Sequence, residues 1–70
     1  MVMMAKGNVW LAEAGTTAKF EVEVPVLDVF DEAAAKRRAF AALCQWANAQ
    51  VNEHVHIVGV KVVRIMRPRG

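Results

Sequence analysis

The chain has 70 residues, 56% of them hydrophobic, and a formal net charge of +2 at pH 7. This length allows a single domain, and so small a charge gives no argument for nucleic acid by itself. A domain of this size buries only about 60–65% of the surface that its unfolded chain exposes. We therefore expect more apolar surface than one core can bury, and we expect another protein to cover the remaining apolar surface.

Cys44 is the single cysteine in the sequence, so no disulfide can form within the chain. Secreted domains of this size usually need such cross-links, and we therefore expect a reducing cytoplasm. The start of the chain is too short and wrongly charged for a signal peptide. No apolar run approaches the roughly 20 residues that span a bilayer.

We expect one domain over residues 1–70, with an N-terminal extension at 1–7 and a basic tail at 67–70. Met1 and Met4 are both candidates for the natural start. Charge is unevenly distributed, because the predicted hairpin region is acidic and the C-terminal end carries bases without acids. The molecule is therefore expected to be dipolar.

Residues 8–26 predict a β-hairpin, with a loop of about three to five residues around 15–17. The first arm is apolar on both faces, as a central strand would be. The second arm alternates apolar and polar residues over 19–26, which is typical of a strand with one solvated face. Pro25 has no N–H for pairing, so we expect this strand at an edge of the sheet.

A helix is predicted from about Val29 to between Ala49 and Val51, with Asp28 as its N-cap. At about 100° per residue, its apolar side chains form a stripe that we expect to pack on the sheet. The members of this stripe are Ala33, Ala39, Phe40, Leu43, Cys44, Trp46, Ala47 and Val51. Within it, Phe40 and Leu43 are predicted to be buried core residues.

Residues 54–66 predict a third strand whose alternation is irregular. One face would carry Val55, Ile57, Val63 and Ile65 with Lys61 among them, and the other Val58, Val60 and Val62. Gly59 is a candidate for a bulge that shifts the register. The alternative is a strand that is apolar on both sides because both sides are covered.

The predicted fold is α+β with the order β-β-α-β: a three-stranded antiparallel sheet in the order 2-1-3 and one helix on one face. The other face and the outer edge of the third strand have no cover within the chain. Ribosomal proteins, phage proteins and half-ferredoxin folds share this arrangement. Such a fold does not by itself give a function.

Catalytic groups are scarce in this sequence. It contains no Ser and no Tyr, and its two Thr residues lie in the predicted turn. Nucleophilic catalysis would depend on Cys44, which lies in the apolar stripe where thiols are usually inert packing. There is no Gly-rich phosphate loop and no paired-carboxylate arrangement. We therefore expect no enzymatic activity and no cofactor.

His54 and His56 are the only histidines and would project from one face of the third strand. Two imidazoles can hold a zinc ion when two further ligands complete the site. The sequence offers no Cys pair to do so, and we expect no metal within one chain. A site shared across a dimer axis is the open alternative.

The apolar surplus predicts protein partners, including a second copy. We expect a homodimer in which the third strands, or the sheet faces to which they belong, meet across a two-fold axis. The predicted interface residues are Val58, Val60, Val62 and Arg64. The chain would then be a non-enzymatic module that occupies a surface of a larger protein. Small inhibitors and accessory proteins of phages and plasmids, anti-CRISPR proteins among them, have this size and lack of catalytic groups.

The alternative prediction is an RNA- or DNA-binding module that uses the basic end, as a small ribosomal protein does. Its phosphate contacts would be Lys61, Arg64, Arg67 and Arg69. The three basic side chains at 36–38 would point in directions spread over about 200° around a helix, so they make no single patch. Trp10, Phe20 and Phe40 are assigned to the sheet and core, so no stacking platform for a single strand is expected.

Overall fold

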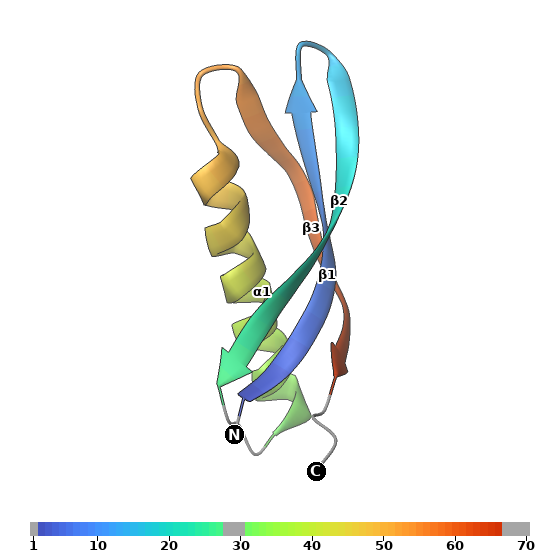
Figure 1. Ribbon diagram of the computed structural model, residues 1–70, viewed down its shortest axis with the longest axis vertical. Helices are drawn as coiled ribbons and strands as arrows, with labels where there is room; N and C mark the ends of the chain where they lie inside the picture. Colours follow the sequence, from blue (N-terminus) through green and yellow to red (C-terminus); the bar gives the residue numbers. More distant parts are fainter. Residues whose placement is uncertain (1, 28–30, 67–70) are drawn as a thin grey trace.

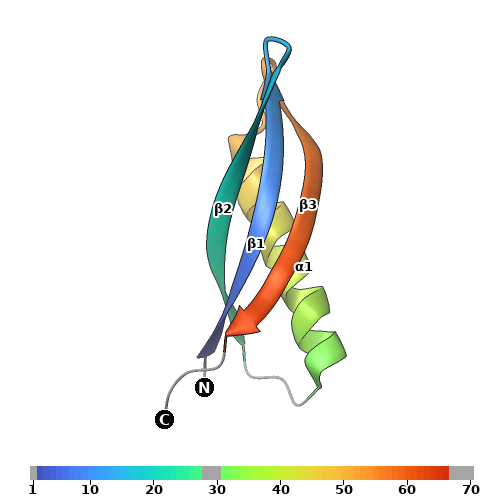
Figure 2. The same cartoon turned by 90° about the vertical axis from the view of Figure 1, so that its right-hand side faces the viewer.

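The chain folds as three long strands and one helix in the order β-β-α-β (Figure 1). The computed structural model describes residues 2–27 and 31–66. Its elements are β1 (Val2–Glu13), β2 (Thr16–Leu27), α1 (Glu32–Gln50) and β3 (Val55–Met66). The strands pair antiparallel in the order β2-β1-β3, as predicted, and α1 lies along one face of the sheet (Figure 2).

β1 is the central strand and is longer than predicted. It begins at Val2, so residues 2–7 belong to the sheet and are not the extension that the sequence suggested. Its pairing with β2 runs from Val2 opposite Leu27 to Glu13 opposite Thr16. Pro25 lies in β2 at the edge of the sheet, where its missing N–H leaves no gap in the ladder.

Ala14 and Gly15 alone connect β1 to β2, so the hairpin loop has two residues and not the predicted three to five. Both residues have positive φ, 51° and 79°. A two-residue type I′ turn requires this backbone, and its twist matches that of the strands it joins. Gly adopts positive φ readily, whereas an L residue such as Ala is strained there by about 1–2 kcal/mol.

The helix begins later than predicted, at Glu32, because β2 continues to Leu27. The N-cap is Asp31, not Asp28, which lies outside the residues that the structure describes. The Asp31 Oδ1 accepts a hydrogen bond from the Ala33 N–H at 2.9 Å, as N-cap carboxylates do. At the other end, the Asn52 Oδ1 accepts from the backbone N–H groups of residues 54 and 55, which directs the chain into β3.

The core lies between α1 and the sheet, and its helix side is centred on Leu43. Leu43 is fully buried, as predicted, but Phe40 is 47% exposed, so its predicted burial is wrong. The buried helix positions are Ala35, Ala39, Leu43 and Ala47. The helix is thus rotated so that Trp46 reaches toward β2, where its ring lies 6.0 Å from that of Phe20.

Gly7 explains how closely the helix approaches the sheet. A Cβ at this position would overlap a methyl group of Leu43 and lie 2.7 Å from the backbone oxygen of Lys61. Only a glycine leaves room for both neighbours. The small residues on the buried side of α1 and Gly7 in β1 therefore bring the two layers together at mid-sheet.

β3 contains two bulges. Its residues 55–66 pair with only residues 4–13 of β1, and the register shifts between Trp10 and Leu11 and again between Lys6 and Gly7. The unpaired residues are Val58 and Val63. The bulge predicted at Gly59 is therefore found one residue earlier, and a second one was not foreseen.

Each bulge reverses the alternation of side chains along β3, so apolar residues stay on the helix side. The β3 side chains packed against the core are Val55, Ile57, Val60, Val62 and Ile65. Val60 and Val62 therefore do not lie on the open face, as the sequence suggested. Val63, predicted to share a face with Val55 and Ile57, is exposed.

The helix is shorter than the sheet that it covers. The molecule measures 44 × 16 × 16 Å. A 12-residue strand spans about 40 Å, whereas the 19-residue helix spans about 28 Å. The C-terminal end of α1 therefore stops short of the hairpin turn (Figure 1). Across residues 2–27 and 31–66, no helix has the length and hydrophobicity that crossing a bilayer requires.

Candidate functional site

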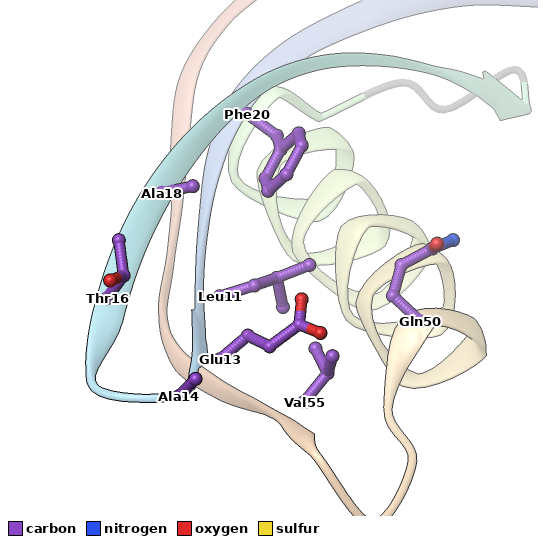
Figure 3. A pocket seen from close by; sticks show the side chains of 8 residues that line it. All are labelled: Leu11, Glu13, Ala14, Thr16, Ala18, Phe20, Gln50 and Val55. Carbon is purple, nitrogen blue, oxygen red and sulfur yellow. The ribbon is translucent and has the colours of Figure 1, made fainter.

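A groove of about 460 Å³ opens where the helix stops short of the hairpin (Figure 3). Its walls come from the β1–β2 hairpin, the end of α1 and the start of β3. The lining residues are Leu11, Glu13, Ala14, Thr16, Ala18, Phe20, Gln50 and Val55. Sequence patterns do not predict this groove, because it depends on the relative lengths of helix and strands.

The floor of the groove is apolar. Leu11 is buried, and its neighbour across the β1–β2 ladder is Ala18. Val55 contributes to the floor from β3. Phe20 lines the groove from β2, with 41% of its surface exposed. The Phe20 ring is held by its tilted contact with Trp46. The groove is therefore lined here by packed side chains, which offer an apolar surface to a ligand.

Among the described residues, Glu13 is the only charged one that lines the groove. Its side chain extends from β1 toward the end of the helix (Figure 3). In the described part of the chain, the salt bridges are Lys6–Glu21 and Glu53–His54, and Glu13 takes part in neither. On the helix side, the Gln50 Nε2 donates to the backbone oxygen of residue 46 at 3.3 Å. The groove thus combines an apolar floor with one carboxylate.

The opposite face of the sheet carries charges sorted by strand. Glu21 and Glu23 alternate outward on β2, and Lys61 and Arg64 lie outward on β3. Lys6 lies between them on β1, with its Nζ 3.8 Å from the Glu21 Oε2. We call this surface, away from α1, the outer face.

Trp10 also lies on the outer face and not in the core. Its neighbours on β1, Val9 and Leu11, are buried on the helix side, so alternation turns Trp10 the other way. It is half-buried between Lys19 and Gly59, where a Cβ on Gly59 would lie 3.5 Å from the Trp10 ring. The strict alternation of side chains along β1 is the sequence signal that could have predicted Trp10 on the outer face.

The residues predicted to form a dimer interface are divided by the structure. Val58 and Arg64 are exposed, whereas Val60 and Val62 are half-buried against the core. Of the predicted phosphate contacts, Lys61 and Arg64 lie exposed on the outer face. The other two, Arg67 and Arg69, lie outside the described residues.

The structure does not bring the candidate metal ligands together. His54 lies before the start of β3, with its Nε2 3.5 Å from a carboxylate oxygen of Glu53, and His56 is within β3. Cys44 is half-buried on α1. Within residues 2–27 and 31–66, no three potential ligands of this kind gather closely enough to hold a metal ion.

Both edges of the sheet carry features that obstruct pairing with another strand. β3 is interrupted by bulges at Val58 and Val63, and β2 contains Pro25. Bulges, prolines and charged residues are the devices by which natural sheets protect their edges. Addition of a partner strand is therefore obstructed at both edges, whereas the groove and the outer face are open.

Comparison with known proteins adds no constraint on these surfaces. No protein-family model matches the chain, and no curated protein or solved structure matches it either.

Proposed function

We propose that this chain is a non-enzymatic protein-interaction module and that its groove binds a partner protein. The groove carries this proposal, because it joins an apolar floor to a single carboxylate, that of Glu13. A partner segment that inserts an apolar side chain and places an Arg or Lys beside Glu13 fits both features. The module would act in a reducing cytoplasm as a small inhibitor or accessory protein, of the kind that phages and plasmids encode.

The walls of the groove are joined by short, hydrogen-bonded connections, which favours binding. The hairpin has only Ala14 and Gly15 as its loop, and the helix end is tied to β3 by the hydrogen bonds of Asn52. A preformed site loses little conformational entropy when it binds. The groove can therefore gain affinity from a small contact area.

The lining chemistry supports binding more than catalysis. Thr16 supplies a hydroxyl and Glu13 a carboxylate, but none of the lining residues that the structure describes is a histidine, lysine or cysteine. Activating a hydroxyl needs an adjacent base within hydrogen-bond reach, together with groups that stabilise developing charge. Recognition is the activity that these side chains can perform.

The test combines site-specific crosslinking with matched charge reversals. A photocrosslinking amino acid at Ala18, inside the groove, should capture a partner that the same probe at Lys36 on the helix does not capture. Glu13→Arg should weaken binding of that partner at least tenfold. Glu53→Arg, an equal charge change outside the groove, should leave it unchanged. Equal binding by both variants would count against the groove.

A second candidate, binding of single-stranded nucleic acid, is favoured by Trp10 on the outer face. An aromatic ring among lysines can stack a base while the cations contact phosphate. Binding of an oligonucleotide would quench Trp10 fluorescence and weaken steeply with salt. Submicromolar affinity at physiological salt, lost in the variant Lys61→Ala with Arg64→Ala, would place nucleic acid ahead of a protein partner.

A further inference from the structure

We propose that the outer face binds a second copy of the chain, in a face-to-face dimer whose two-fold axis runs parallel to the strands. This surface lies across the sheet from the groove, so the proposal is independent of the groove's partner. It rests on the way in which charge is separated between the two edge strands.

The register places acid and base at opposite ends of the same rows. One row across the sheet reads Glu23, Lys6, Arg64, and the next toward the hairpin turn has Glu21 on β2 and Lys61 on β3. Two strand spacings, about 10 Å, separate the outer members of each row. Among the described residues, no acid of β2 forms an ion pair with a base of β3 in the same molecule.

Only one orientation of a two-fold axis makes these charges complementary. An axis parallel to the strands and along β1 places β2 of one copy over β3 of its partner, row by row. Glu23 then faces the partner's Arg64, and Glu21 faces the partner's Lys61. An axis perpendicular to the strands would place acids over acids and bases over bases. Charge complementarity of this kind selects the orientation of an interface.

The centre of the outer face supplies the apolar contact that such an interface needs. Trp10 lies on β1, so the axis would bring it against the Trp10 of the partner subunit. On the neighbouring strand β3, the unpaired residues Val58 and Val63 are 58% and 48% exposed. Lys6, also on β1, would lie near the axis, and its ammonium is drawn toward Glu21 at 3.8 Å.

The available area is sufficient for a specific dimer. Three strands of about 40 Å give a face about 15 Å wide, or roughly 600 Å² on each partner and 1,200 Å² in total. This is the lower limit of specific, stable interfaces. Two sheets stacked in this way also leave the bulged edge of β3 unpaired, which pairing of β3 edges would not.

The solution mass gives the first test. Sedimentation equilibrium at micromolar concentration should give twice the 7.7 kDa mass of one chain. A mass of 7.7 kDa throughout that range would overturn the proposal. A chain that is monomeric alone and binds an oligonucleotide through the same face would also overturn it. The groove variant Glu13→Arg should leave the dimer intact, which separates this result from the test of the groove.

Charge reversal gives the second and sharper test. Glu23→Lys and Arg64→Glu should each weaken the dimer about tenfold or more, because symmetry turns two attractions into two repulsions. An equimolar mixture of the two variants should recover the dimer, since every facing pair in the heterodimer is then complementary. Any loss of fold would not be repaired by mixing. Glu32→Lys, an exposed reversal on α1, is the matched control.

Other results in this experiment would overturn the proposed geometry. Single variants that dimerise as well as the native chain would exclude these charges from the interface. A mixture that stays as weak as its components would also do so. If Glu23→Lys alone strengthened association, acids would be facing acids, and the axis would run perpendicular to the strands.

Discussion

The two ends of the sheet are built from the same strands but differ in what covers them. At the end covered by α1, alternate residues such as Val22 and Val24 are buried beneath the helix. At the hairpin end, all residues from 13 to 20 are exposed. Phe20 and Val22 occupy equivalent positions two residues apart, yet they are 41% and 8% exposed. Apolar alternation therefore predicts which side a residue faces and not whether anything covers it.

The largest effect should come from the covered end. Leu43→Ala removes a fully buried side chain that lies against Gly7, and it should lower the free energy of unfolding by about 2–5 kcal/mol. Urea denaturation followed by circular dichroism measures this loss. Phe40→Ala on the same helix should cost less than about 1 kcal/mol, because that side chain is half-exposed. Equal losses for the two variants would mean that the helix is rotated differently.

Gly7→Ala tests the close approach of the layers. The new methyl group meets both Leu43 and the backbone of Lys61, so we expect a loss of about 1–3 kcal/mol. Gly59→Ala is the matched control on the outer face, where the methyl group would make an ordinary contact with Trp10 at 3.5 Å. A neutral result for Gly7→Ala would show that the helix does not pack against mid-sheet.

Phe20→Ala separates stability from recognition at the hairpin end. We expect a loss of about 1 kcal/mol in thermal or urea unfolding, since much of the ring is already exposed. Binding of the groove's partner should fall much more, at least tenfold. Lys19→Ala, on the outer face of the same strand, should change neither quantity much. A loss of stability comparable to that of Leu43→Ala would make the hairpin end part of the core.

The smallest effect should be a gain at the hairpin turn. Ala14→Asn should raise the free energy of unfolding by about 0.5–1 kcal/mol, because Asn tolerates the positive φ of this position better than Ala. Thr17→Asn, a nearby exposed strand position, should give no gain. A destabilised Ala14→Asn variant would contradict the two-residue turn.

Local patterns in the sequence predicted three strands and their order correctly, although β1 begins earlier than expected. The alternation over 19–26 placed β2 correctly, and Pro25 placed it at an edge. The errors concern features set by contacts between elements. Asp28 and Asp31 are both suitable N-caps, and the length of β2 decides between them. Phe40 was misplaced because many small alanines leave the rotation of a helix undetermined until it meets the sheet.

The candidate sites were harder to predict for a related reason. Val60 and Val62 were assigned to the wrong face because a bulge reverses the alternation, and no residue type marks Val58 or Val63 as unpaired. The groove arises from the difference in length between α1 and the strands. That difference becomes visible only when the elements are placed side by side.

The two bulges also determine where β3 can change in length. Residues 55–66 follow a path that is two residues longer than the segment of β1 beside it, an excess of about 6–7 Å. Deleting Val58 or Val63 would leave every remaining pair of the β1–β3 ladder opposite its present neighbour. Deleting Val60, which is away from both bulges, would instead reverse the side on which part of the strand presents its side chains. The strand should therefore tolerate single-residue deletions at the two bulges better than between them.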